Sequence, residues 1–325
     1  ILDEGQKYMY LMGFIGIQMM ISSILSSSYR EIGRVRVILV ITLIAAGSNA
    51  FLNWVLIYGH LGMPRLEVEG AAYATIIAKT VEMLLLIGYT IKERPEFISF
   101  SVFKRIDWAL FGRILKKGSL LIISQMMWVL SESFTAAIYN GRGNAAVVSG
   151  MAASFSIANL FFISFDGITT ATGVLIGKSL GMNELDDARK EKTWMLSAAI
   201  IFGCIMCLVG VVTVLLVPVV FGNLSIDAQN ICRAMLLLMA LFMPLWTYVN
   251  TQLAVCRAGG DTKVGFFVDG GTTAVMIPML LILAFFTNAS PVMMYFGVKA
   301  LDVGKIIVAT HEMKKERWVV NLSNA

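Results

Sequence analysis

Long apolar segments, each of a length that can cross a lipid bilayer, dominate the sequence. A membrane-spanning helix needs roughly 20 apolar residues, because the hydrocarbon core is about 30 Å thick and each helical residue rises about 1.5 Å. Strands in lipid would leave backbone groups unpaired, and these segments lack the alternating polarity of barrel strands. We therefore predict an all-α polytopic membrane protein with about nine transmembrane helices, over 7–28, 36–59, 70–91, 118–140, 145–177, 195–220, 232–256, 265–287 and 291–311.

The composition supports a membrane protein, and the basic residues predict its orientation. Of the 325 residues, 58% are hydrophobic and only 14% are charged, which is too few charges to cover a soluble domain of this length. Nineteen of the Lys and Arg residues lie in alternate loops and the C-terminal tail, and four lie on the opposite side. Since basic loops stay in the cytoplasm, we expect a cytoplasmic C-terminus and an outside Ile1. This bias explains the net positive charge, so we expect no nucleic-acid partner.

A polar stretch divides the predicted helices into two groups. Residues 92–117 mix charges with aromatic residues, as an amphipathic helix on the cytoplasmic face would. We expect an incomplete N-terminal lobe of three helices over 1–91, and a C-terminal lobe of six helices with a tail over 118–325. Arg30–Gly33 and Arg257–Gly260 share one spacing and lie six predicted helices apart. This weak repeat is typical of secondary transporters, and it predicts that three helices precede residue 1.

Enzyme and metal signatures are lacking in the sequence. It contains no H-E-x-x-H, G-x-S-x-G or phosphate-binding glycine loop, and its two histidines, His60 and His311, lie near predicted membrane edges. The four cysteines fall in or at the ends of apolar segments, where no further metal ligands are near. We predict neither an enzyme nor a resident metal centre.

Several motifs resemble those of the multidrug and toxic compound extrusion (MATE) family of efflux transporters, prokaryotic type. They occur in the family's order along nearly the whole chain: NAFLNWVLIYGHLGMPRLEVEGAAYAT (49–75), IYNGRGNAAVVSGMAA (138–153), GVLIGKSLGMNELDDARK (173–190), LAVCRAGGDTK (253–263) and KERWVVNL (315–322). The resemblance implies helices 4–12 of a twelve-helix transporter built from two six-helix lobes. It also implies a secondary antiporter, in which the lobes rock to export a drug or a cationic or amphiphilic metabolite while Na⁺ or H⁺ enters. We expect a monomer in the plasma (inner) membrane, with no cofactor other than that coupling ion.

Candidate coupling-ion residues lie in both predicted lobes. Asn49 and Asn53 share a helix face, and Thr75 lies on the next helix. In the resembling family this group helps an acid of helix one, which this sequence does not contain, to hold the ion. Oxygens of amides and hydroxyls suit Na⁺, but intramembrane Asn also simply bonds neighbouring helices. Gln125 stands where relatives carry an acid, and Glu132 lies seven residues later on nearly the same face, where it could substitute or pair with a neighbouring donor.

Candidate substrate-binding residues lie on two further helices. Asn159 and Asp166 form a second polar line with seven-residue spacing, and a cleft-facing acid there could attract cations. Trp246 and Asn250 share a face just after Pro244, offering a ring for cation–π contact and a polar anchor. Ordinary packing or a contact with a hydroxyl remains the alternative for each of these residues.

Two other functions remain open. A lipid-linked sugar flippase needs a strongly cationic cavity, whereas the intramembrane bases Lys79, Lys299 and Lys305 each have an acid nearby in sequence. For Lys299 and Lys305 that acid is Asp302, within the same helix. The second alternative is a non-transporting truncated remnant, since missing helices would expose cleft faces to lipid.

Overall fold

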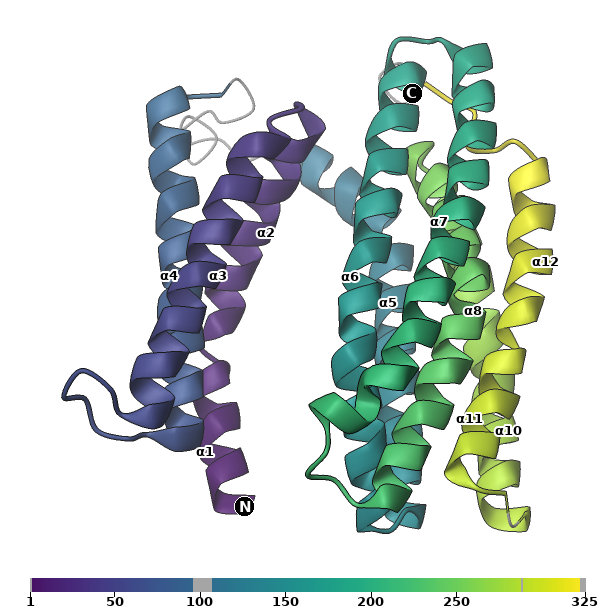
Figure 1. The fold of residues 1–325 in the computed structure, drawn as a ribbon. Helices are drawn as coiled ribbons and strands as arrows, with labels where there is room; N and C mark the ends of the chain where they lie inside the picture. The colour runs from purple at the N-terminus through teal and green to yellow at the C-terminus, as the bar shows by residue number, and fades with distance from the viewer. Residues whose placement is uncertain (1, 96–106, 288, 322–325) are drawn as a thin grey trace. The chain divides into compact units, whose positions relative to one another are not determined.

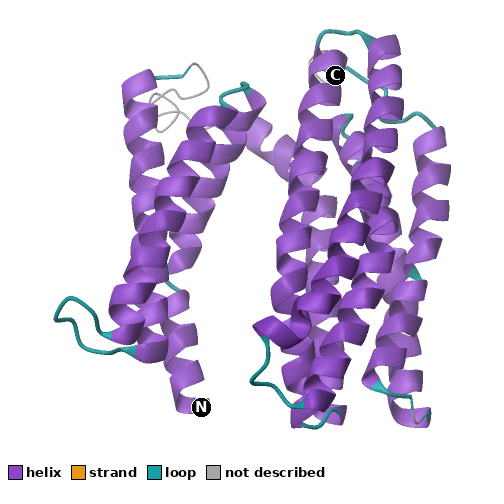
Figure 2. Ribbon diagram, viewed as in Figure 1, coloured by secondary structure: helices purple, strands orange, loops and turns teal. Residues whose placement is uncertain are grey.

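The protein is helical throughout the part that the computed structural model describes, which comprises residues 2–95, 107–287 and 289–321. Short loops join the helices, and no strand occurs in these ranges (Figure 2). Within them, eight helical stretches are long and apolar enough to cross a membrane. The predicted all-α polytopic fold is confirmed. The chain divides into two compact units, Ile1–Ile106 (unit 1) and Asp107–Ala325 (unit 2), which we describe separately.

Unit 1 is a small helical bundle (Figure 1). The predicted segment 7–28 is two helices, since the chain turns at Gly13 and Phe14. At Gly70 an added Cβ would lie 2.6 Å from the carbonyl oxygen of Leu56, so glycine permits the close approach of two helix backbones there. The helices are α1 (Leu2–Met12), α2 (Ile15–Glu31), α3 (Val35–Tyr58) and α4 (Glu67–Glu93).

Unit 2 is built around one long helix, α8, which packs against α6, α7 and α12 (Figure 1). The backbones of α7 and α8 approach closely at Gly203, where an added Cβ would lie 2.5 Å from the Cα of Pro244. The unit contains α5 (Trp108–Arg142), α6 (Ala145–Gly181), α7 (Leu185–Val220), α8 (Ile226–Ala258), α9 (Lys263–Gly265), the π-helical turn η2 (Phe266–Gly270), α10 (Gly271–Phe286), α11 (Pro291–Ala300) and α12 (Asp302–Lys314).

Polar residues in the sequence fix where two of these long helices begin. The Asn144 side chain accepts a hydrogen bond from the Val147 amide at 3.0 Å, and the Ser225 hydroxyl accepts one from the Ala228 amide at 3.3 Å. Such caps satisfy backbone donors that a helix leaves free in its first turn. They therefore start α6 and α8 directly after short turns.

The last predicted membrane segment, 291–311, differs from the expectation of one continuous helix. It is divided at Leu301 into α11, of 10 residues, and α12, of 13 residues. Lys299 lies in the last turn of α11 and Asp302 in the first turn of α12. These are the helix ends at which a cation and an anion are respectively favoured. The division places both charges beside the cavity described below.

Apolar side chains on α7 face outward. Leu208, Leu215 and Val219 are 68%, 74% and 80% exposed in a helix whose most apolar window has a mean hydropathy of 3.0. Such a surface would be unfavourable in water and matches the environment of lipid chains. Of the polar stretch 92–117, residues 96–106 lie outside the described residues, and 108–117 form the start of α5.

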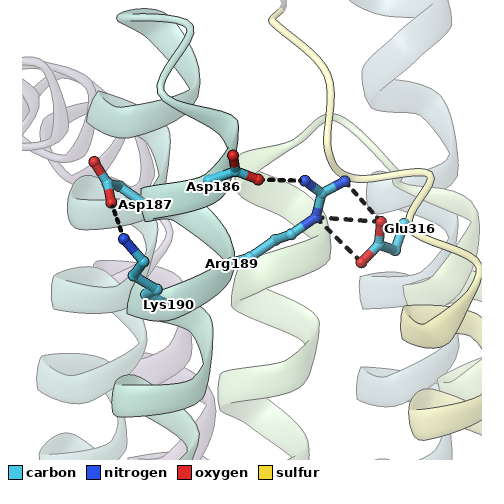
Figure 3. A network of polar contacts seen from close by, with 5 residues as sticks. All are labelled: Asp186, Asp187, Arg189, Lys190 and Glu316. Atoms are coloured by element: carbon cyan, nitrogen blue, oxygen red, sulfur yellow. Dashed lines mark hydrogen bonds and ion pairs between the residues drawn. The ribbon is translucent and has the colours of Figure 1, made fainter.

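The C-terminal segment is held to the start of α7 by an exposed ionic network (Figure 3). The Arg189 guanidinium donates to Asp186 and to Glu316, each at 2.9 Å, and Lys190 pairs with Asp187. The hydrogen bonds from Arg189 lower the pKa of the Glu316 carboxyl. A carboxyl group with a lowered pKa in the folded state adds stability that is lost as the pH falls through that pKa. Acid should therefore loosen this attachment.

Candidate functional site

A cavity of about 820 Å³ lies within unit 2 and collects the predicted polar residues of this unit. Side chains from α5, α6, α8, η2, α10, α11 and α12 line it. Its volume falls in the range typical of small-molecule sites. The sequence-predicted residues on its wall are Gln125, Glu132, Asn159, Asp166, Trp246 and Asn250.

On α5, Glu132 faces this cavity and forms an ion pair with Lys299 of α11, with 2.9 Å between Oε1 and Nζ. The two side chains are 33% and 14% exposed, respectively. Gln125, on the same helix, is exposed in the cavity wall. The expectation that Lys299 is neutralised by Asp302 within its own helix is wrong, because the lysine reaches across to α5.

A second group of charges continues along the cavity wall. The Trp246 Nε1 donates to Asp302 Oδ2 at 2.8 Å, and Lys305 lies 3.2 Å from Asp302 and 3.8 Å from Asp269. The expected pairing of Asp302 with Lys305 within one helix is therefore confirmed. Asn250 Nδ2 donates to the Trp246 carbonyl oxygen at 2.8 Å. This hydrogen bond ties the Asn250 side chain to the backbone of α8, the helix that also carries Trp246.

The α6 residues of the cavity are less engaged. Asn159 and Asp166 are exposed on its wall, as expected from their seven-residue spacing. Among the described residues, no side chain donates a hydrogen bond or forms an ion pair with the Asp166 carboxylate. The acids lining the cavity are Glu132, Asp166, Asp269 and Asp302, and the bases are Arg257, Lys299 and Lys305. With all of them charged, the formal balance is one negative charge.

In unit 1, Asn49, Asn53 and Thr75 form one hydrogen-bonded group. Asn53 Nδ2 donates to Asn49 Oδ1 at 3.0 Å, and Asn49 Nδ2 donates to Thr75 Oγ1 at 3.5 Å. The buried Oδ1 of Asn53 accepts no hydrogen bond from any described residue. The group therefore joins α3 to α4 and also leaves an oxygen with a free lone pair.

The two aromatic contacts around Lys299 were not predicted from the sequence. Its ammonium lies 5.6 Å from the ring centroid of Trp246 and 5.5 Å from that of Tyr295. Tyr295 precedes Lys299 by four residues, a spacing that places both on one helix face and could have indicated the contact. Spacing alone could not show that the ring of Trp246, on α8, would contact Lys299 of α11.

The chain is similar to known membrane transport proteins. A family model described as MatE matches residues 121–293. The Probable multidrug resistance protein NorM of Mesorhizobium japonicum is 26% identical over 291 residues, which cover 86% of this chain and 61% of that relative. The namesake protein of Listeria innocua is 25% identical over 314 residues, covering 94% of this chain and 67% of the relative. The chain thus spans less than two thirds of the length of the Mesorhizobium relative.

Solved structures share the fold. A MATE in complex with MaL6 superposes with a TM-score of 0.80 at 16% identity, covering 96% of this chain and 69% of that one. An inward-facing multidrug resistance MATE family transporter of the MOP superfamily gives a TM-score of 0.75 at 15% identity, covering 97% and 72%.

Proposed function

The chain belongs to the MatE family, and from this membership we propose that it acts as a secondary active antiporter for drugs or other cationic or amphiphilic compounds. Members of this family are transporters and not enzymes. The substrate leaves in exchange for Na⁺ or H⁺ as two lobes rock. Residues 1–91 and 118–325 belong to different lobes, joined by 92–117. The protein acts as a monomer in the plasma (inner) membrane, with its C-terminus in the cytoplasm.

One observation carries the choice of a cationic substrate: the unit-2 cavity contains an acid without a partner among the described residues, which leaves the cavity with a negative formal balance. Asp166 supplies that carboxylate, and Trp246, Asn159 and Asn250 line the same cavity. A carboxylate in a partly enclosed cavity attracts a cation more strongly than one in bulk water, because the local dielectric constant is lower. Asp166 is therefore the anchor for the positive charge of the substrate.

The coupling ion is assigned to a different place. Asn49, Asn53 and Thr75 offer neutral oxygens of the kind that bind Na⁺, and one of them already lacks a donor among described residues. Glu132 is engaged by Lys299, and Gln125 cannot titrate, so Glu132 contributes to the charge of the cavity in unit 2 and both residues contribute to its shape. The intramembrane lysines lie 2.7 Å (Lys79), 2.9 Å (Lys299) and 3.2 Å (Lys305) from carboxylate oxygens, so their charges are balanced. This balance does not favour a flippase for lipid-linked diphosphates, which needs a strongly cationic cavity.

Replacing the anchor tests the proposal. We expect Asp166→Asn to lower the transport of a fluorescent organic monocation by purified protein in liposomes about tenfold, which corresponds to about 1.4 kcal/mol. Transport of a neutral amphiphile should change little. The matched control is Asp227→Asn, an exposed carboxylate of α8 that does not line the cavity. If Asp166→Asn slowed the transport of the monocation and of the neutral amphiphile equally, the positive charge of the substrate would bind elsewhere. An unchanged transport rate for the monocation would lead to the same conclusion.

A further inference from the structure

The ammonium group of Lys299 lies in an enclosure made by one carboxylate and two aromatic rings. Glu132 accepts its hydrogen bond at 2.9 Å, and the centroids of Trp246 and Tyr295 lie 5.6 and 5.5 Å from Nζ. Only 14% of the lysine side chain is exposed. This arrangement is the one by which proteins recognise ammonium ligands, with negative charge on one side and ring faces on the others.

The walls of this enclosure are fixed by contacts of their own. The Trp246 indole is held by its hydrogen bond to Asp302, at 2.8 Å. The Tyr295 ring is 1% exposed and packs edge-on against Phe155, with centroids 6.4 Å apart and an interplanar angle of 80°. Since neither contact involves Lys299, the two rings should keep their places when the ammonium leaves. A wall held in this way is preorganised for a ligand.

The enclosure also opens onto the space where a ligand would arrive. Glu132, Trp246, Tyr295 and Lys299 all line the 820 Å³ cavity. An ammonium group entering this cavity therefore meets a site of the right chemistry that the protein's own lysine already fills.

We propose that Glu132, Trp246 and Tyr295 form a binding site for a primary alkylammonium group, and that the side chain of Lys299 is its resident occupant. The ammonium group of a transported cation first contacts Asp166 in the same cavity and then displaces Lys299 from this site. Only this last step depends on the proposed transport function; the site itself does not. The tethered lysine also sets selectivity, because a ligand gains the site only by outcompeting an ammonium of high local concentration.

Vacating the site provides the test. In purified protein, we expect Lys299→Ala to bind n-propylammonium with a Kd at least tenfold lower than that of the unsubstituted protein, measured by calorimetric titration. Adding Glu132→Gln to this variant should abolish the gain, and neutral 1-propanol should not bind. The matched control is Lys79→Ala, which vacates a Lys–Glu pair of 2.7 Å that has no ring contact among the described residues. It should show no gain.

Each remaining outcome decides the proposal. Equal propylammonium affinity in Lys299→Ala, Lys79→Ala and the unsubstituted protein overturns it. If Lys299→Ala folds only when propylammonium is present, that rescue supports the site; if it stays unfolded at every concentration while Lys79→Ala folds, the site is refuted. Tight amine binding by Lys299→Ala in a protein that exports no organic cation leaves the site standing and refutes the proposed function alone.

Discussion

Charged side chains are tolerated in the apolar bundle of unit 2 because they neutralise one another, between α5 and α11 for Lys299 and within α12 for Lys305. A single charge at the centre of a membrane helix costs about 2.5–3.5 kcal/mol on insertion scales. Lys299 and Lys305 avoid that cost through carboxylates at 2.9 and 3.2 Å, and their side chains are only 14% and 19% exposed. Paired charges of this kind shape a cavity without giving it a large net charge, so the unpartnered Asp166 determines the sign that a ligand experiences.

The indole N–H of Trp246 has a structural role that can be tested separately from that of the aromatic face. We expect Trp246→Phe to lower the free energy of unfolding by about 1–3 kcal/mol, because it removes the donor to the buried Asp302 carboxylate while keeping an aromatic face. Thermal unfolding in detergent measures the loss. The control is Trp194→Phe, at a tryptophan that is 68% exposed, which should change little. Equal effects of the two substitutions would show that the hydrogen bond contributes nothing.

At the scale of elements, the turn after α8 is held against the C-terminal segment. An added Cβ at Gly259 would lie 1.7 Å from the carbonyl oxygen of Trp318, a separation that no side-chain rotation relieves. Trp318 itself is 1% exposed, and Lys192 lies 5.8 Å from its ring centroid. The motif LAVCRAGGDTK (253–263) therefore meets the segment around Trp318, at the end of the bundle where Arg189 binds Glu316.

This contact predicts a specific effect of one methyl group. We expect Gly259→Ala to displace the segment around Trp318 and to expose its indole, which red-shifts the tryptophan emission and increases cleavage by trypsin after Arg317. Gly177→Ala is the matched control, because a Cβ there meets nothing within 4 Å. If both variants keep the emission and cleavage pattern of the unsubstituted protein, the segment does not pack as described.

The helices could be predicted from the sequence because the apolar length that crosses a bilayer leaves a strong signal. The interruption at Gly13 could not, since the residues around it remain apolar and hydropathy does not change there. At Leu301 the charged Lys299 and Asp302 flank the interruption, but charges three residues apart also suit one continuous helix, so spacing alone did not predict it. Seven-residue spacing correctly grouped Gln125 with Glu132, and it grouped Asn159 with Asp166 on the same wall. Periodicity identifies a shared face of one helix and does not say which helix that face meets.

At the scale of the whole molecule, contacts between residues that are distant in sequence could not be predicted. Glu132 and Lys299 are 167 residues apart, and their pairing depends on how α5 and α11 are rotated within unit 2. The preference of apolar side chains for lipid determines that a helix spans the bilayer. Side-chain packing between helices determines how that helix is rotated about its own axis. The family was nevertheless evident from motifs that occur in order along the chain, and the match to the MatE model confirms it.

Gradient-driven exchange in liposomes tests the central claim most directly. Purified protein is reconstituted with a fluorescent organic monocation inside, and a Na⁺ or H⁺ gradient is directed inward. The account predicts that one of the two gradients accelerates dye efflux about tenfold, equivalent to about 1.4 kcal/mol, and that an ionophore for that ion abolishes the acceleration. Dye efflux at the same rate with either gradient, with neither, and with the ionophore would contradict it.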